Sequence, residues 1–133
     1  MSLDDDNRRL IVNDELAKSY DALTDAEVLM EKERWNGAAN RFYYALFHAA
    51  NALLIHDAHT VKSHKGSLRA FSQHYVITGK VPPEYGVLFS QFETLREGSD
   101  YTGFYRVAPE KLIQKVPLAK EMIDTIAEMV KEN

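Results

Sequence analysis

Cysteine is absent from the 133-residue sequence, which excludes disulfide bonds, thiolate metal sites and cysteine nucleophiles. No apolar run approaches the ~18 residues that a membrane-spanning helix needs, so we expect no membrane association. The amino terminus is acidic and polar, unlike a secretory signal, and we therefore expect a cytoplasmic protein. Phosphate-binding glycine loops and the GxSxG nucleophile motif are also missing, so the sequence predicts no cofactor.

Glycine and proline are scarce, with six and four residues, and they fall mostly between segments of helical periodicity. No alternating strand pattern is present. Helices are predicted over residues 6–33 and 35–56, from a cap at Thr60 or Ser63 to residue 77, from the Pro82-Pro83 pair to residues 98–101, and from residue 109 onward. Short connections between five helices predict an all-α, five-helix antiparallel up-and-down bundle that forms one domain over residues 1–133.

The helix predicted over residues 35–56 is apolar around most of its circumference, which is typical of a buried central helix. We expect five of its side chains to be fully buried: Phe42, Ala45, Leu46, Ala49 and Leu53. In the preceding helix, a spacing of three, four or seven predicts a buried stripe of Leu16, Tyr20, Leu23 and Met30.

The net charge of −4 conceals a basic middle segment. Residues 34–80 hold six basic residues against one acid, Asp57, whereas residues 1–33 hold ten acids against four bases. A surface formed by the middle segment could attract phosphate groups. The alternative interpretation is ordinary scatter of solvated charge.

Arg41, Tyr44 and His48 are spaced three and four residues apart, so they share one face of the central helix. A guanidinium on such a face can bind phosphate or carboxylate in a bidentate way. In the alternative interpretation Arg41 pairs with an internal carboxylate such as Asp100, while Tyr44 and His48 are hydrogen-bonded core groups.

A second polar segment, residues 62–66, contains Lys62, His64 and Lys65 at the start of a predicted helix. Free amides at a helix amino terminus attract anions, and the two lysines strengthen that field. His64 could act as an acid or a base near neutral pH. A histidine at the head of a core-facing stripe can equally be structural.

The third polar segment holds Arg96, Asp100, Tyr101 and Tyr105. It contains either a second phosphate-binding arginine held by Asp100 or a simple ion pair at a helix end. The five histidines show neither a His-Glu-x-x-His motif nor the paired Glu-x-x-His of di-iron bundles, so no metal is expected.

Three sequence blocks occur in order: Asn40-Arg41-x-Tyr43-Tyr44-Ala45-x-Phe47-His48, Lys62-Ser63-His64-Lys65-Gly66 and Arg96-x3-Asp100-Tyr101. Together they resemble the small prokaryotic HEPN proteins, and most closely a group with NRxYYAxF, KxHKG and RxxxDY patterns. The resemblance covers nearly the whole chain. It implies an all-α up-and-down bundle that usually dimerises. It also implies kinship with metal-independent ribonuclease toxins, which are often encoded beside a restraining minimal nucleotidyltransferase.

The nuclease signature of that family is an arginine and a histidine that follows it after four to six intervening residues. Arg96 matches the arginine, but no histidine follows it in the chain. Cleavage of RNA without metal needs a proton acceptor for the ribose 2′-hydroxyl. His64 or His48 could supply it if the fold brings one of them close to Arg96.

The favoured hypothesis is a homodimeric HEPN-like module that binds RNA or a nucleotide phosphate with weak or no catalysis, as part of a toxin–antitoxin pair with a nucleotidyltransferase. The alternatives are an active ribonuclease that uses Arg96 with His64 as a relocated base, and a helical module that binds only a protein partner. The candidate catalytic residues are Arg96 and His64. The candidate binding residues are Arg41, Tyr44, His48, Lys62, Lys65, Asp100, Tyr101 and Tyr105. We expect seven of these residues to converge on one concave surface: Arg41, Tyr44, Lys62, His64, Arg96, Asp100 and Tyr101.

Overall fold

A computed structural model of the chain describes residues 4–60, 63–101 and 106–131, with residues 99–101 described only as part of a helix. The helices, in chain order, are α1 (Asp5–Glu31), α2 (Trp35–His56), α3 (His64–Phe71), a turn of π-helix η1 (Ser72–Val76), α4 (Pro83–Tyr101) and α5 (Pro109–Lys131). The described part of the chain contains no strand. The predicted all-α bundle of five α-helices is confirmed.

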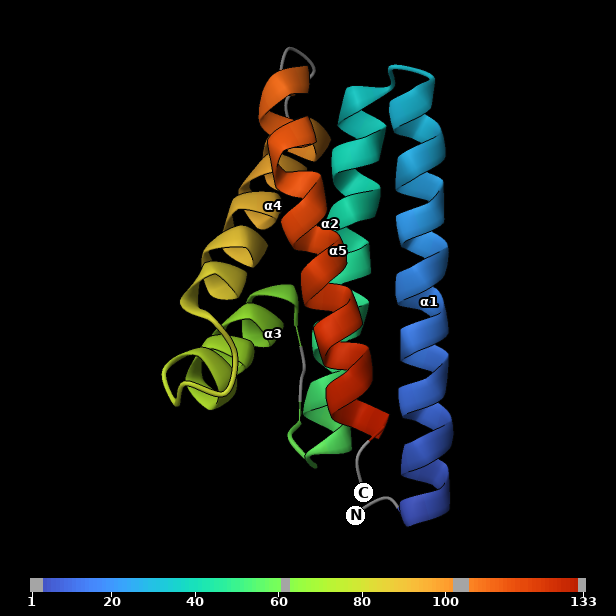
Figure 1. The fold of residues 1–133 in the computed structure, drawn as a ribbon, viewed down its shortest axis with the longest axis vertical. Helices are drawn as coiled ribbons and strands as arrows, with labels where there is room; N and C mark the ends of the chain where they lie inside the picture. Colours follow the sequence, from blue (N-terminus) through green and yellow to red (C-terminus); the bar gives the residue numbers. More distant parts are fainter. Residues whose placement is uncertain (1–3, 61–62, 102–105, 132–133) are drawn as a thin grey trace.

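The four long helices run alternately up and down, and the short α3 and η1 lie at an angle to them (Figure 1). Within the described residues, α2 is the one helix that contacts each of α1, α3, α4 and α5. The five side chains predicted to be fully buried are at most 1% exposed, as the all-round apolar pattern of α2 requires. None of the described helices combines the length and apolar character needed to cross a bilayer.

The packing face of α1 differs from the predicted stripe. Tyr20 is 38% exposed and donates a hydrogen bond to Asp124 Oδ1 on α5 at 2.8 Å. The buried side chains of α1 are mostly small, namely Val12, Ser19, Ala22, Leu23 and Ala26. Small residues let α1 approach the alanine-rich α2 closely, and the hydroxyl of Ser19 donates to the carbonyl of Ala45 at 2.6 Å.

Two predicted helix ends also differ from the structure. Helix α1 ends at Glu31 because Glu33 adopts a left-handed φ of 58°, the conformation that commonly follows a helix end. The helix predicted to reach residue 77 gives way after Phe71 to the π-helical turn, in which the Ile77 amide bonds to the Ser72 carbonyl at 2.9 Å. The turn carries Tyr75, whose hydroxyl donates to Asp57 Oδ2 at 2.7 Å.

We predict that Phe42→Ala lowers the free energy of unfolding by about 3–5 kcal/mol, because it opens a cavity in the core around α2. Ile113→Ala removes a side chain that is 50% exposed and should change stability by less than about 1 kcal/mol. Chemical denaturation followed by circular dichroism measures both values. Equal stability of the two variants would contradict the central position of α2.

Candidate functional site

Polar side chains on one face of α2 lie around the ring of Tyr44. Arg41 lies one turn before Tyr44, and its guanidinium carbon is 4.9 Å from the ring centroid. His48 lies one turn after it, with 6.3 Å between ring centroids, and His64 from α3 is 5.7 Å away in an edge-on arrangement. We call Arg41, Tyr44, Phe47, His48 and His64 the Tyr44 cluster; all five are partly exposed. The structure therefore brings together candidate residues from two separate sequence blocks.

Helix α3 delivers His64 to this cluster as its first residue. Ser63 caps the helix, as one of the two predicted caps, by accepting a hydrogen bond from the Gly66 amide at 2.9 Å. The His64 ring stacks on Phe47 with a centroid distance of 4.5 Å and an interplanar angle of 27°. Its Nδ1 atom lies 2.8 Å from the hydroxyl of Tyr43. Stacking and a hydrogen bond together fix the orientation of the imidazole.

Beneath the cluster lies a buried layer that links His64 to Arg96. Tyr43 is fully buried, and the guanidinium carbon of Arg96, on α4, lies 4.9 Å from its ring centroid. Arg96 and Glu93, one turn apart on α4, are each 8% exposed. Tyr43 therefore contacts both of the candidate catalytic residues, Arg96 through its ring and His64 through its hydroxyl.

The surroundings of Tyr43 keep its hydroxyl protonated. Burial raises the pKa of Tyr43, and the charge of Glu93 raises it further, while the charge of Arg96 and a hydrogen bond from it act in the opposite direction. A buried phenol needs an acceptor for its proton, and His64 Nδ1 is the hydrogen-bond partner that the hydroxyl of Tyr43 has, so the phenol donates to Nδ1. In this arrangement neutral His64 carries its proton on Nε2.

His64 is held in its neutral form near pH 7. Burial lowers the pKa of His64, and the positive charges of Arg96 and His48 lower it further, while Glu93 opposes them. A neutral imidazole that accepts at Nδ1 presents an N–H donor at Nε2. His64 is thus suited to donate a hydrogen bond to an anionic oxygen of a ligand.

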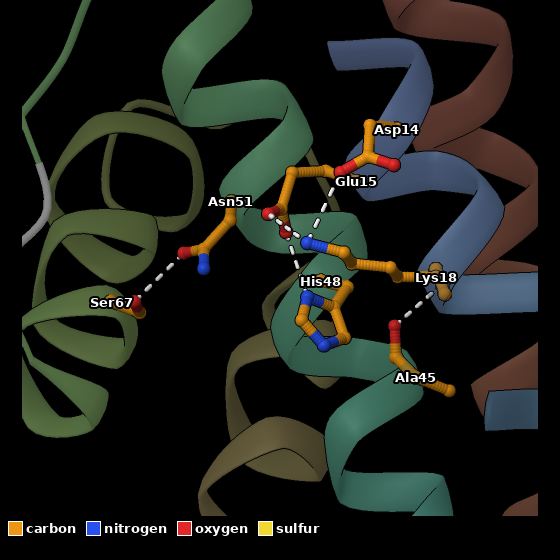
Figure 2. A network of polar contacts seen from close by, with 8 residues as sticks. Asp14, Glu15, Lys18, Ala45, His48, Asn51 and Ser67 are labelled. Carbon is orange, nitrogen blue, oxygen red and sulfur yellow. Dashed lines mark hydrogen bonds and ion pairs between the residues drawn. The ribbon is translucent and has the colours of Figure 1, made fainter. Parts of the chain in front are cut away.

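His48 has a different partner. Its Nδ1 atom lies 2.7 Å from Oε2 of Glu15, which projects from α1, as Figure 2 shows. Lys18 lies beside the same carboxylate, 3.9 Å from Oε1, and forms a closer ion pair of 3.1 Å with Asp14. In the Tyr44 cluster, His64 therefore contacts a phenol, whereas His48 contacts a carboxylate.

Arg41 keeps much of its hydrogen-bonding capacity for a ligand. Its guanidinium donates to Asn40 Oδ1 at 3.1 and 3.2 Å and covers the Tyr44 ring. None of the ion pairs found among residues 4–60, 63–98 and 106–131 involves Arg41. The side chain is partly exposed, so an anionic group can reach it.

The remaining candidate residues are placed less completely. Lys65 is exposed in the first turn of α3. Asp100 and Tyr101 belong to the last turn of α4, and their side chains lie outside the described part. Lys62 and Tyr105 lie outside the described residues altogether. Convergence of the seven residues named in the sequence analysis on one concave surface stays a prediction.

Three residues of this region were not singled out from the sequence. Tyr43 appears above only as a member of the first sequence block, and Glu93 follows Phe92 in a core-facing stretch of α4. Glu15 shares the three-and-four spacing of the residues by which α1 packs on α2, namely Val12, Ser19, Ala22 and Ala26. An acid on such a packing face is the sequence signal that could have identified it, because a buried carboxylate needs a partner. Within the described residues, no group of three metal-ligating side chains was found.

The comparisons with known proteins agree with the sequence blocks. The model of the HEPN domain matches residues 12–131. A UPF0332 protein of Thermotoga maritima is 31% identical over 86% of this chain and 87% of its own length. A protein of Methanocaldococcus jannaschii named "putative toxin" is 31% identical over 83% of this chain and 81% of its own length. A UPF0332 protein of Gloeobacter violaceus is 31% identical over 68% of this chain and 71% of its own. On the extent of these matches, the chain belongs to the HEPN family.

Proposed function

We propose that the Tyr44 cluster binds the phosphate groups of RNA or of a nucleotide, and that the protein cleaves RNA slowly or not at all. The observation that carries this proposal is the position of Arg41, whose partly exposed guanidinium lies over Tyr44 in a cluster that also holds His48 and His64. Arginine and an imidazole N–H both donate to phosphate oxygens. The exposed Lys65 adds positive charge on the same helix as His64.

The biological setting in the proposal is a toxin–antitoxin pair. Two relatives from Methanocaldococcus jannaschii bear the name "putative toxin", at 31% and 25% identity. The partner we propose is a nucleotidyltransferase-type antitoxin, as the HEPN resemblance implies. We further propose a homodimer that acts in the cytoplasm. A gene for a small nucleotidyltransferase next to this one would support the pairing.

A second candidate function, metal-independent cleavage of RNA with Arg96 and His64, is favoured by one observation. Tyr43 contacts both side chains, so two residues 32 positions apart in the sequence lie against the same tyrosine. Arg96 could stabilise negative charge that develops on the phosphorus oxygens. The proton on Nε2 of neutral His64 is unfavourable for a base, and for this reason we rank cleavage by this pair below binding.

We predict that Arg41→Gln weakens binding of a short single-stranded RNA by about tenfold or more, because one charged hydrogen-bond donor to phosphate is lost. Wild-type affinity should fall as salt is raised, and the variant should show a shallower dependence. Arg9→Gln is the matched control, since it removes the same charge from an exposed position on α1. Fluorescence anisotropy measures both variants. Equal weakening by the two changes would show a response to net charge and contradict a site at the Tyr44 cluster.

RNA cleavage is tested with labelled RNA in excess EDTA. We predict that purified protein cleaves at least about 100-fold more slowly than a HEPN nuclease that carries the histidine after its arginine. Robust cleavage that is lost in both His64→Gln and Arg96→Lys, at unchanged melting temperature, would instead establish the second candidate function. Absence of both cleavage and salt-dependent RNA binding would favour a module that binds only a protein partner.

The homodimer is tested by sedimentation equilibrium. We predict a mass of about twice 15.2 kDa at protein concentrations on the order of tens of micromolar. A single species of 15.2 kDa under these conditions would contradict the dimer.

A further inference from the structure

Among the ion pairs of the described residues, the Glu15–His48 pair is the most enclosed, and it lies between α1 and α2. The side chain of His48 is 21% exposed and that of Glu15 is 15% exposed. Their contact of 2.7 Å joins residues 33 positions apart, so it depends on the packing of the two helices (Figure 2). His48 also lies against Phe47, at 5.3 Å between ring centroids, and Phe47 in turn stacks on His64.

The contact with Glu15 decides which nitrogen of His48 carries the proton. An ionised carboxylate only accepts hydrogen bonds, so Nδ1 of His48 is the donor. In the neutral ring, the lone pair is then on Nε2. Within the described residues this Nε2 has no hydrogen-bond partner, yet it is not among the enclosed polar atoms that lack one, so it reaches the surface. His48 therefore offers an oriented, accessible proton acceptor.

His64 has the opposite arrangement. Its Nδ1 lone pair is engaged by the hydroxyl of Tyr43, and its Nε2 carries the proton. The two imidazoles of the Tyr44 cluster thus present an acceptor and a donor to a ligand bound between them. Metal-free cleavage of RNA needs both kinds of group near the phosphate.

We infer that His48, oriented by Glu15, is the general base of this site and takes the proton from the 2′-hydroxyl of a bound RNA. The inference rests on the proposed binding of RNA at the Tyr44 cluster. It names the catalytic residue for slow cleavage of that RNA. Glu15 is a positioning residue, because it acts through the imidazole. Arg41 and His64 hold the phosphate by donating to its oxygens.

The reaction is an internal transesterification. Nε2 of His48 accepts the 2′-hydroxyl proton while the 2′-oxygen forms a bond to the adjacent phosphorus. The bond between phosphorus and the 5′-oxygen breaks, and that oxygen takes a proton from water. The products are a 2′,3′-cyclic phosphate and a 5′-hydroxyl, and the proton on His48 returns to solvent. The step consumes no metal, oxidant or further reactant.

The charged and titratable groups that face the two imidazoles come from every helix packed against them. Helix α1 contributes Glu15 and Lys18, and α2 contributes Arg41 and Tyr44. Helix α3 supplies His64, and α4 contributes Arg96 and Glu93 through their effect on His64. Glu15 is the carboxylate in direct contact with the accepting imidazole.

His56 provides a matched control on the same helix. Its Nδ1 also contacts a carboxylate, Asp57 Oδ1, at 2.7 Å. The side chains of this pair are more exposed, at 31% and 35%, and the pair lies at the carboxyl end of α2, away from the Tyr44 cluster. A substitution there removes a carboxylate-bound imidazole without touching the site.

The experiment follows cleavage of a labelled single-stranded RNA in EDTA and identifies the products by their 2′,3′-cyclic ends, with RNA binding measured in parallel. Wild-type protein should produce these ends slowly. His48→Asn should lower the rate by about 100-fold or more while retaining RNA binding, and His56→Asn should leave the rate unchanged. His64→Gln should weaken RNA binding, because it removes a hydrogen-bond donor to the phosphate.

Two further measurements keep the test decisive if His48→Asn lowers the melting temperature. Added imidazole should restore cleavage to His48→Ala, which a purely structural histidine would not allow. Glu15→Gln should lower the cleavage rate and leave RNA binding unchanged, because an amide no longer fixes the proton of His48 on Nδ1.

Wild-type protein that binds RNA and releases no cyclic phosphate would overturn the role of His48 and leave the proposed binding function intact. Cleavage at the wild-type rate in His48→Asn would also overturn the role of His48. An equal loss of cleavage rate in His48→Asn and His56→Asn would do the same. Failure of the wild-type protein to bind RNA would instead refute the proposed function.

Discussion

The hydroxyl of Tyr43 is the contact on which the candidate site depends. It lies on a central helix whose neighbours leave it no access to water, so its hydrogen bond must be made within the protein. An unmade bond at such a position costs about 1–3 kcal/mol. The bond to His64 satisfies this requirement and at the same time ties the start of α3 to α2. The ring of the same tyrosine supports Arg96 from α4.

The candidate site also depends on close packing between α1 and α2. The alanines of α2 and the small residues of α1 let the two helices approach until a side-chain hydroxyl on one, Ser19, reaches a backbone carbonyl of the other. The same approach brings Glu15 against His48. A wider spacing, as between helices faced with large residues, would place water between the carboxylate and the imidazole.

Two histidines that pack against the same two rings, Tyr44 and Phe47, thus acquire different properties from their hydrogen-bond partners. A phenol directs the proton of His64 to its outer nitrogen, whereas a carboxylate directs the proton of His48 to its inner one. The sequence departs from the nuclease signature of HEPN proteins by the absence of a histidine after Arg96. The structure shows two other imidazoles beside the same region of the bundle, which is why the missing histidine does not by itself settle whether RNA is cleaved.

The sequence by itself determined the helices, because helical periodicity, capping residues and left-handed glycines are local properties. It predicted the fully buried residues of α2 and, as one of two alternatives, the Ser63 cap. It also placed Arg41, Tyr44 and His48 on one face of α2. The tertiary structure alone decided that Tyr20 is exposed, that Tyr43 joins His64 to Arg96, and that Glu15 meets His48. Spacing along a helix fixes which residues share a face, but the partner of that face depends on how neighbouring helices are rotated and shifted, which follows from packing of the whole core.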